Sequence, residues 1–259
     1  DRLDDGLQAL LEVAAVLGAG DERAHVERVD DVVLQQVGDL VLHDGERDVI
    51  VKFSPLLDGS PAATRWKDLL IAEHVASITL RRGGVAVPDN RIILSAKRCY
   101  LESARFDRAG AKGRIATVSF EAIDNAFIGA RRSWGASASL LRAGGMITPE
   151  CEAQIKLLEW FGRCIANTDM HFGNLSFFWD KQDTAVSLNL APVYDMLPML
   201  YAPEKSEIVE RMFKPPRVAE ADAALGLAYQ FWKDLALRDD VSEAFRKIAV
   251  ANAALLGSQ

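Results

Sequence analysis

The part of this sequence that says most about its fold is Asn167-Thr168-Asp169-Met170-His171-Phe172-Gly173-Asn174. Polar side chains that can coordinate or hydrogen-bond fill this stretch, although hydrophobic segments flank it on both sides. A buried polar group costs free energy unless it is hydrogen-bonded, so a hydrophobic core does not select such residues. The stretch therefore indicates a loop that carries chemistry, placed between a helix that ends near Ile165 and a strand.

The residues that follow the loop predict a β-hairpin. Hydrophobic runs over residues 175–178 and 185–190 are separated by the turn residues Asp180-Lys181-Gln182-Asp183. Because a hairpin places its two ends side by side, we expect Asn174 to meet Asp195, although the two are far apart in sequence. An Asn carbonyl and an Asp carboxylate are oxygen ligands suited to Mg²⁺, which completes its octahedron with water and substrate phosphates.

Asp169 and Lys52 add the remaining parts of a phosphoryl-transfer site. In such a site an Asp accepts the proton of the substrate hydroxyl, while metal ions and a Lys neutralise the phosphates. Lys52 lies in the otherwise apolar strand run Asp48–Phe53, where a charge is costly unless it has a partner such as a phosphate. A strand-end Lys also often extends its ammonium group to solvent. Glu73, on the next helix, either pairs with Lys52 as in kinases or belongs to a solvated helix face.

The rest of the chain predicts an α+β protein. Its 259 residues, 49% of them hydrophobic, suffice for one large domain or two lobes. Hydrophobic spacing predicts helices over residues 7–17, 65–81, 225–235 and 245–256, and a further helix opens at Thr148-Pro149-Glu150 with a capping hydroxyl and an early Pro. Short apolar runs predict strands over residues 32–34, 40–42, 48–53, 85–87, 92–94 and 99–101.

Composition excludes several classes of function. A net charge of −7 argues against nonspecific binding to nucleic acid, which depends on clustered Lys and Arg. The three cysteines have neither the spacing of a metal site nor the even count of a disulfide framework, so we expect a reducing, cytoplasmic location. No stretch is long and apolar enough to span a bilayer, and the first residues lack a signal segment, so we expect no membrane association.

Four motifs carry a resemblance to a known family: Val51-Lys52-Phe53, Arg105-Phe106-Asp107-Arg108, residues 165–177 and residues 190–197. Together they resemble the HipA-like serine/threonine kinases, toxins of bacterial toxin–antitoxin modules. The resemblance implies a two-lobed protein-kinase-like fold, with a smaller β-rich N-lobe over residues 1–104 and a mostly helical C-lobe over residues 105–259. The chain begins with Asp1 and not with Met, so we expect a short or N-terminally incomplete member.

The resemblance also implies a role for each candidate residue. The implied roles are phosphate contact for Lys52, an adenine hinge from the backbone of Ala104, Arg105 and Phe106, general base for Asp169, nucleotide proximity for His171, and Mg²⁺ ligation for Asn174 and Asp195. The implied cofactors are ATP and Mg²⁺. The implied partners are a translation-related protein substrate and an antitoxin, with DNA contacted only through an antitoxin complex. Asp107 with Arg105 and Arg108 would form a structural ion-pair cluster.

Two departures from the family pattern bear on activity. Many relatives have a Lys before the metal-binding Asn, whereas this chain has Gly173. The Gly/Ser-rich loop that covers the phosphates should precede the strand Lys, and only Gly18-Ala19-Gly20 qualifies. If the loop is missing, so is the serine that such kinases autophosphorylate, and we assign no regulatory site.

Two other functions fit the same residues. A small-molecule kinase of the aminoglycoside or choline type shares the Asp-x4-Asn spacing, although such enzymes usually carry His two residues before the Asp, where this chain has Asn167. A catalytically weak kinase-like module that binds an antitoxin without transferring phosphate would account for the poor glycine loop.

Replacing Asp195 with Ala is expected to abolish binding of the Mg-nucleotide complex, because the hairpin brings this carboxylate to Asn174 as the second metal ligand. Isothermal titration calorimetry with Mg-nucleotide checks this expectation, and an unchanged affinity would contradict it.

Overall fold

The structure of this chain is a computed structural model that describes residues 38–43, 48–110, 113–129, 132–182, 185–216 and 222–258. The helix predicted over residues 7–17, the strand predicted over residues 32–34 and the glycines at 18 and 20 lie outside the described residues.

A four-stranded antiparallel sheet forms the first part of the fold. Its strands are β1 (Gly38–His43), β2 (Asp48–Phe53), β3 (Asn90–Leu94) and β4 (Cys99–Ala104), in the spatial order β1-β2-β4-β3. In β2, Val49, Val51 and Phe53 are buried in one small cluster with Tyr100 of β4. Successive side chains of a strand point to opposite faces, so Lys52 points to the other face, toward α2. Thus β2 forms as predicted, and Lys52, its only charged residue in mid-strand, faces α2.

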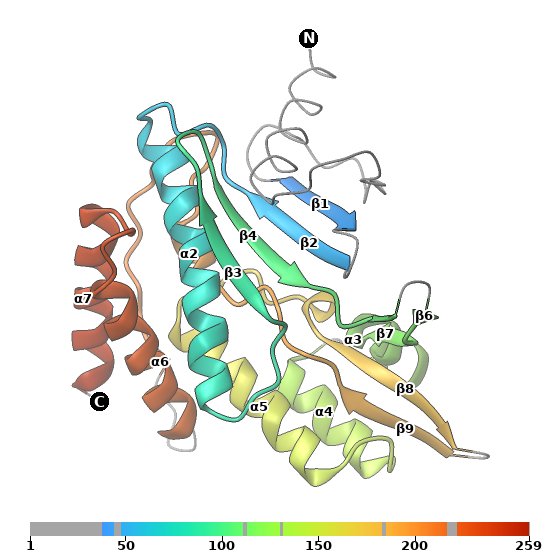
Figure 1. The fold of residues 1–259 in the computed structure, drawn as a ribbon. Coiled ribbons are helices and arrows are strands. Elements are labelled where there is room, and N and C mark those ends of the chain that lie inside the picture. The colour runs from blue at the N-terminus through green and yellow to red at the C-terminus, as the bar shows by residue number, and fades with distance from the viewer. Residues whose placement is uncertain are drawn as a thin grey trace.

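Helix α2 (Pro61–Arg82) packs between this sheet and α6, as Figure 1 shows. It begins four residues before the predicted start at Arg65, because Ser60 caps it by accepting a hydrogen bond from the N–H of Ala63 (3.2 Å) and Pro61 takes the first helical position.

The strand predicted over residues 85–87 does not form. Gly83 and Gly84 end α2, and Gly84 has a φ of +80°, a left-handed conformation that glycine adopts without steric cost. This turn directs the N–H of Val85 back to the carbonyl of Leu80 (3.0 Å). Val85 is buried because it closes the helix end, and its hydrophobicity does not reflect strand pairing.

Helices dominate the second half of the chain. They are α3 (Phe120–Ile123), the π-helix η1 (Asp124–Ile128), α4 (Trp134–Ala143), α5 (Pro149–Cys164), α6 (Asp222–Ala236) and α7 (Glu243–Gly257). Helix α5 starts as predicted, with the hydroxyl of Thr148 accepting from the N–H of Cys151 (3.2 Å). The two predicted closing helices are confirmed as α6 and α7.

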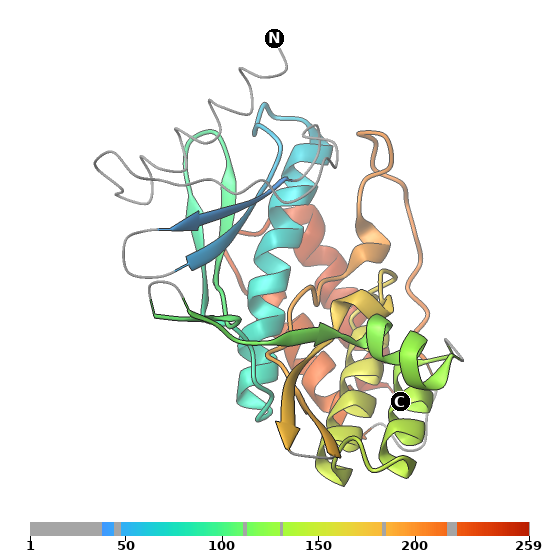
Figure 2. The ribbon, with the colours of Figure 1, turned by 90° about the vertical axis from the view of Figure 1, so that its right-hand side faces the viewer.

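The predicted hairpin is confirmed as β8 (Ser176–Gln182) and β9 (Ala185–Leu190), which pair antiparallel. A short strand, β7 (Thr117–Ser119), pairs with β8 and completes a second sheet. Figure 2 shows this sheet beside α4 and α5, away from the four-stranded sheet on α2. The remaining short elements are β5 (Arg108–Ala109), β6 (Gly113–Arg114), η2 (Phe172–Asn174) and η3 (Met199–Tyr201).

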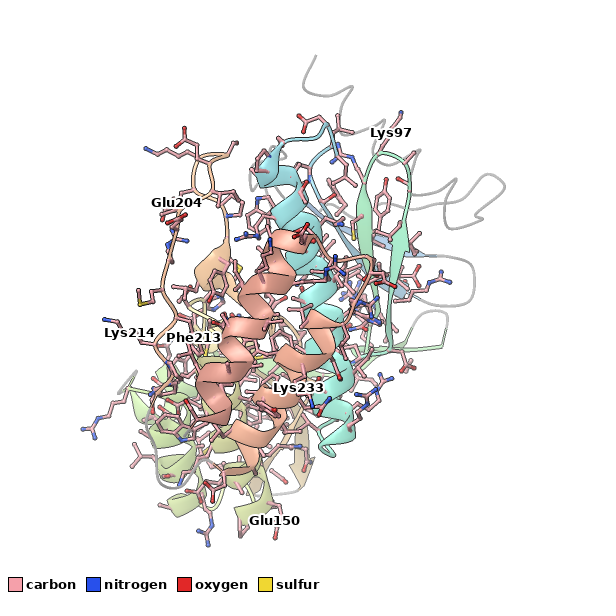
Figure 3. All side chains as sticks on the ribbon, turned by 90° about the vertical axis from the view of Figure 1, so that its left-hand side faces the viewer. Lys97, Glu150, Glu204, Phe213, Lys214 and Lys233 are labelled. Carbon is pink, nitrogen blue, oxygen red and sulfur yellow. The ribbon has the colours of Figure 1, made fainter. Side chains whose placement is uncertain are left out.

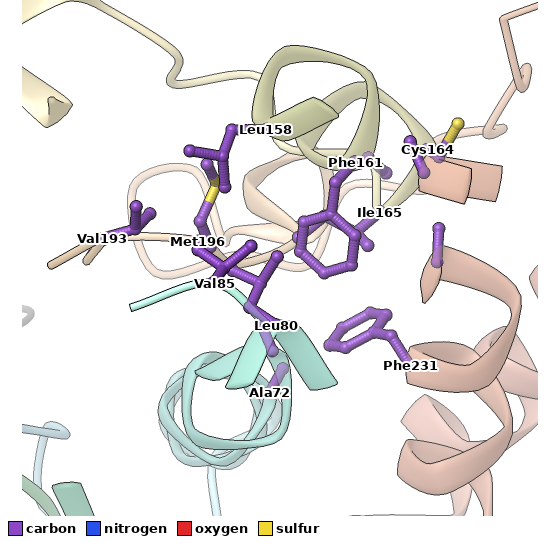
Figure 4. Close-up of a cluster of buried hydrophobic side chains, with 14 of the residues drawn as sticks. Ala72, Leu80, Val85, Leu158, Phe161, Cys164, Ile165, Val193, Met196 and Phe231 are labelled. Carbon is purple, nitrogen blue, oxygen red and sulfur yellow. The ribbon is translucent and has the colours of Figure 1, made fainter. Parts of the chain in front are cut away.

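One large hydrophobic core joins α2 to the helical half. In Figure 4, Leu80 of α2, Phe161 of α5 and Phe231 of α6 gather around the same interior. Phe213, labelled in Figure 3, also belongs to this core and packs against Trp232 of α6, with ring centroids 6.3 Å apart, which holds the segment between η3 and α6 in place. Because α2 also packs on the sheet, its position fixes the sheet relative to the helices. The proposed division into lobes at residues 104 and 105 stays a prediction.

Within the described residues, no helix combines the length and apolar character that a membrane crossing requires.

Replacing Phe161 with Ala is expected to lower the free energy of unfolding by about 3–5 kcal/mol, because it opens a cavity in a fully buried part of the core. Urea denaturation followed by circular dichroism measures the change. Leu237→Ala is the control, since Leu237 is 78% exposed, and should change the free energy by less than about 0.5 kcal/mol. Equal effects of the two changes would contradict the assigned core.

Candidate functional site

Lys52 is held by two carboxylates from different parts of the chain. Its Nζ donates to both side-chain oxygens of Glu73 in α2, at 2.8 and 3.0 Å, and to Oδ1 of Asp195. The Lys52 side chain is 19% exposed and that of Glu73 is 6% exposed. Of the two interpretations of Glu73, the pairing with Lys52 is therefore the correct one. Lys52 does not extend to solvent as a strand-end Lys often does.

Asp195 follows β9 in an unusual backbone conformation. Its φ is +58°, in the left-handed region that non-glycine residues seldom adopt. Such conformations persist where the surroundings hold them in place, and they are frequent at functional sites. The conformation directs the Asp195 carboxylate to Lys52 while its carbonyl is held elsewhere.

Asn167 links the loop of residues 167–174 to the segment of Asp195. Its side-chain oxygen accepts from the N–H of Asp169 (3.0 Å), and its side-chain nitrogen donates to the carbonyl of Asp195 (3.2 Å). Asn167 is buried, so both groups need these partners. One side chain therefore sets the position of the candidate base relative to a candidate metal ligand.

The predicted convergence of Asn174 and Asp195 is reflected in the contacts of their chain neighbours. The hydroxyl of Tyr194 donates to the carbonyl of Gly173 (3.1 Å) and lies 3.0 Å from the hydroxyl oxygen of Ser176. Burial raises the pKa of the Tyr194 phenol above its usual value, and the nearby charge of Asp195 adds to this effect, so the group stays protonated and can donate. These contacts join the chain neighbours of the two predicted metal ligands, and the direct approach of Asn174 to Asp195 stays a prediction.

Asn174 has one side-chain oxygen whose hydrogen-bonding capacity is unused. Its amide nitrogen donates to the carbonyl of Asp169 (2.9 Å), which fixes the side chain. Its Oδ1 is buried and has no hydrogen-bond partner among the described residues. A buried, unpartnered acceptor is uncommon, and a bound cation is one of the few ways to satisfy it.

Asp169 is exposed, in contrast to the buried Asn167 and Asn174 of the same loop. Its backbone N–H is fixed by Asn167, while its carboxylate makes no hydrogen bond or ion pair with another described residue. The side chain is therefore open to a substrate. This arrangement suits a general base, which must reach the proton that it abstracts.

His171 and Gly173 form a compact turn at the start of η2. The Nδ1 atom of His171 accepts from the N–H of Gly173 (3.1 Å), which leaves the proton of a neutral ring on Nε2. A Cβ at position 173 would lie 2.9 Å from two atoms of that ring. A Lys there would require His171 to move, so the glycine and the histidine conformation belong together. Within the described residues, no hydrogen bond joins the His171 side chain to Lys52, Asp169 or Asp195.

The predicted hinge lies at the end of β4. The N–H of Ala104 donates to Asp89 (2.8 Å) and that of Arg105 to Asp48 (2.9 Å), both to backbone carbonyls. The N–H of Phe106 has no backbone partner among the described residues. The Phe106 ring stacks on the ring of Tyr194, with centroids 6.0 Å apart, so the hinge touches the residue before Asp195.

Asp107 forms the predicted ion-pair cluster. Its carboxylate receives two hydrogen bonds from Arg105, at 2.8 and 2.6 Å, and one from Arg108 at 2.6 Å. The Arg105 guanidinium lowers the pKa of Asp107 below its usual value, which keeps the carboxylate charged. These residues hold one another and stabilise the turn after the hinge.

Sequence reasoning placed Asn167 in the candidate loop without giving it a role, and it did not assign Tyr194 to the site. Both act through hydrogen bonds to backbone groups of residues distant in sequence, and no spacing rule signals such contacts. Glu73 had a weak signal, because a kinase pairs its strand Lys with a helix Glu.

Comparison with known sequences gives two matches. The sequence profile described as "HipA-like C-terminal domain" matches residues 21–254. The Toxin YjjJ of Escherichia coli (strain K12) is 40% identical over 212 residues, which are 79% of this chain and 47% of that protein. The chain therefore spans about half the length of this curated relative.

Comparison with solved structures identifies the fold. The proinflammatory kinase CtkA of Helicobacter pylori has a TM-score of 0.56 at 13% identity, covering 91% of this chain and 92% of that chain. The HipA, HipB and operator DNA complex of Shewanella oneidensis MR-1 contains a chain with a TM-score of 0.53 at 15% identity, covering 92% of this chain and 65% of that one. These likenesses confirm the predicted α+β kinase-like fold.

Replacing Glu73 with Gln is expected to lower the free energy of unfolding by about 1–3 kcal/mol, because it weakens the interaction of a buried carboxylate with the Lys52 ammonium group. Urea denaturation measures the change. Glu210→Gln removes the same charge from an exposed position and should leave the stability unchanged within error. Equal stability of the Glu73→Gln variant and the unmodified protein would contradict a structural role for the pair.

Proposed function

This chain belongs to the family of HipA-like C-terminal domains, and we propose that it is a Mg-ATP-dependent serine/threonine protein kinase. The observation that carries this proposal is the position of Lys52, which bridges Glu73 of α2 and Asp195 after β9. Kinases use such a Lys–Glu ion pair to place an ammonium group on the ATP phosphates. Asp169 and Asn174 lie on the loop that Asn167 ties to Asp195, so hydrogen bonds connect the candidate base to a candidate metal ligand.

The donor set fits a magnesium ion. Asn174 offers a buried amide oxygen without a partner among the described residues, and Asp195 offers a carboxylate that is 33% exposed. These are hard oxygen ligands, which Mg²⁺ prefers together with water and phosphate oxygens. When bound, the ion would neutralise charge on the phosphates.

Asp169 is the group that we assign to the acceptor. The hydroxyl oxygen of a Ser or Thr attacks the γ-phosphorus, the bond from that phosphorus to the β-phosphate oxygen breaks, and ADP leaves. The carboxylate of Asp169 accepts the hydroxyl proton, and its exposure allows a protein side chain to approach it. Lys52 and its partner Glu73 orient the phosphates during this step.

The end of β4 is the region that we assign to the adenine ring. Two of the three hinge N–H groups already bond to backbone carbonyls, and the N–H of Phe106 is the remaining donor. The Phe106 ring, stacked on Tyr194, would position this donor relative to Asp195. His171 would lie at the nucleotide edge.

We extend the proposal to the biological context through the relatives. Toxin YjjJ is named a toxin, and the structure from Shewanella oneidensis MR-1 holds HipA with HipB and operator DNA. By analogy, this chain would be a cytoplasmic toxin that phosphorylates a translation-related protein, binds an antitoxin and contacts DNA only through that antitoxin.

Transfer from labelled ATP tests the proposal most directly. The full-length protein should label a protein acceptor in the presence of Mg²⁺, and Asp169→Ala should reduce the rate by roughly a hundredfold or more, because general-base catalysis is lost. Asp239→Ala, at an exposed aspartate, should leave the rate unchanged.

The other outcomes identify other functions. Labelling of small acceptors alone would indicate a small-molecule kinase. Absence of Mg-dependent turnover with intact partner binding would indicate a binding module and contradict the kinase proposal.

A further inference from the structure

We propose that Lys52 masks Asp195 until phosphates bind, so that the protein takes up its metal ion with the nucleotide and not before it. This inference rests on the proposed function, because it uses the assignment of Asp195 as a metal ligand. It concerns the order in which the metal ion and the nucleotide bind. The roles proposed for the individual residues do not specify this order.

The two carboxylate partners of Lys52 differ in how firmly they hold it. Glu73 receives two hydrogen bonds from Nζ, at 2.8 and 3.0 Å, and its side chain is only 6% exposed. Asp195 engages Nζ through one oxygen, and its side chain is 33% exposed. Separating Lys52 from Glu73 would break two hydrogen bonds from an ammonium group to a buried carboxylate, which is unfavourable. Separating it from Asp195 exposes a carboxylate to water and is much easier.

The backbone of Asp195 is held by a contact that does not involve Lys52. Asn167 holds its carbonyl at 3.2 Å, and its left-handed φ of +58° is fixed by the surrounding contacts. Only the carboxylate can therefore exchange partners, between the ammonium group of Lys52 and a cation. The other protein ligand is already in position, because Asn174 is fixed by its bond to the carbonyl of Asp169 and keeps its buried Oδ1 available.

Charge decides which partner Asp195 takes. In the absence of nucleotide, a divalent ion at Asp195 would displace the Lys52 ammonium group and then lie beside a positive charge. Nucleotide phosphates reverse this situation, because they accept hydrogen bonds from Lys52 and place further negative charge at the metal position. Lys52 stays on Glu73 and changes its second acceptor from Asp195 to a phosphate oxygen. Binding of metal and of nucleotide then reinforce each other, and this coupling is reciprocal.

Metal binding to the nucleotide-free protein tests the inference. Mn²⁺ replaces Mg²⁺ as the probe, because carboxylate and carbonyl ligands suit both ions and free Mn²⁺ is counted by electron paramagnetic resonance. Lys52→Met should bind Mn²⁺ roughly tenfold more tightly than the unmodified protein, since the mask is removed. Lys52→Arg retains the charge and should bind as weakly as the unmodified protein.

Two controls separate masking from a general charge effect. Lys97→Met removes the same charge at the turn between β3 and β4 (Figure 3) and should leave the Mn²⁺ affinity unchanged. The double variant Lys52→Met with Asp195→Ala should lose the gain. An unchanged Mn²⁺ affinity in Lys52→Met, or a gain in affinity that survives the loss of Asp195, overturns the inference.

If circular dichroism shows that Lys52→Met does not fold, Glu73→Gln tests the inference instead. This change leaves Lys52 more firmly on Asp195 and should weaken Mn²⁺ binding. Tighter or equal binding in that variant overturns the inference.

The result is independent of catalysis. If the protein transfers no phosphate and Lys52→Met still gains Mn²⁺ affinity, only the kinase proposal fails. If the protein is an active kinase and Lys52→Met gains none, only the masking inference fails.

Discussion

The ion pairs of Lys52 hold together three parts of the chain that are far apart in sequence. The ammonium group comes from β2, one carboxylate from α2 and the other from the segment after β9. A charged group inside a largely apolar fold requires partners of opposite charge, so these three elements must pack in one arrangement to satisfy it. In the proposed function, the same ammonium group contacts the ATP phosphates. Structural stability and candidate chemistry thus depend on one interaction.

Helix α2 gives this interaction a rigid support. One side of the helix presents Glu73 to the sheet, and Leu80 near its end enters the large core with Phe161 and Phe231. Packed cores transmit displacements because they contain few voids. The position of Glu73, and through it that of Lys52, is therefore set by hydrophobic contacts far from the site. The loop that carries Asp169 receives its own support from Asn167, whose two hydrogen bonds connect it to Asp195.

Local rules predicted those parts of the fold that depend on neighbouring residues. The apolar alternation of β2, the capped start of α5 and the two runs of the β8–β9 hairpin formed as expected, because hydrophobic period, cap and turn chemistry act over a few residues. The prediction of a strand over residues 85–87 was wrong for a related reason. Its hydrophobic residues serve the end of α2, where Val85 bonds back to Leu80, and periodicity cannot distinguish that role from strand pairing.

By itself, the sequence determined the types of residue at the site and, through the four motifs, the family to which the chain belongs. Asp169, Asn174, Lys52 and Asp195 could be proposed as site residues because their chemistry and spacing are local properties. Tertiary structure alone decided how they are joined. The choice of Glu73 as partner of Lys52, the buried Asn167 between two loops and the left-handed backbone of Asp195 all arise from contacts between residues distant in sequence. Such contacts depend on how helices and sheets pack, and packing is a property of the whole folded chain.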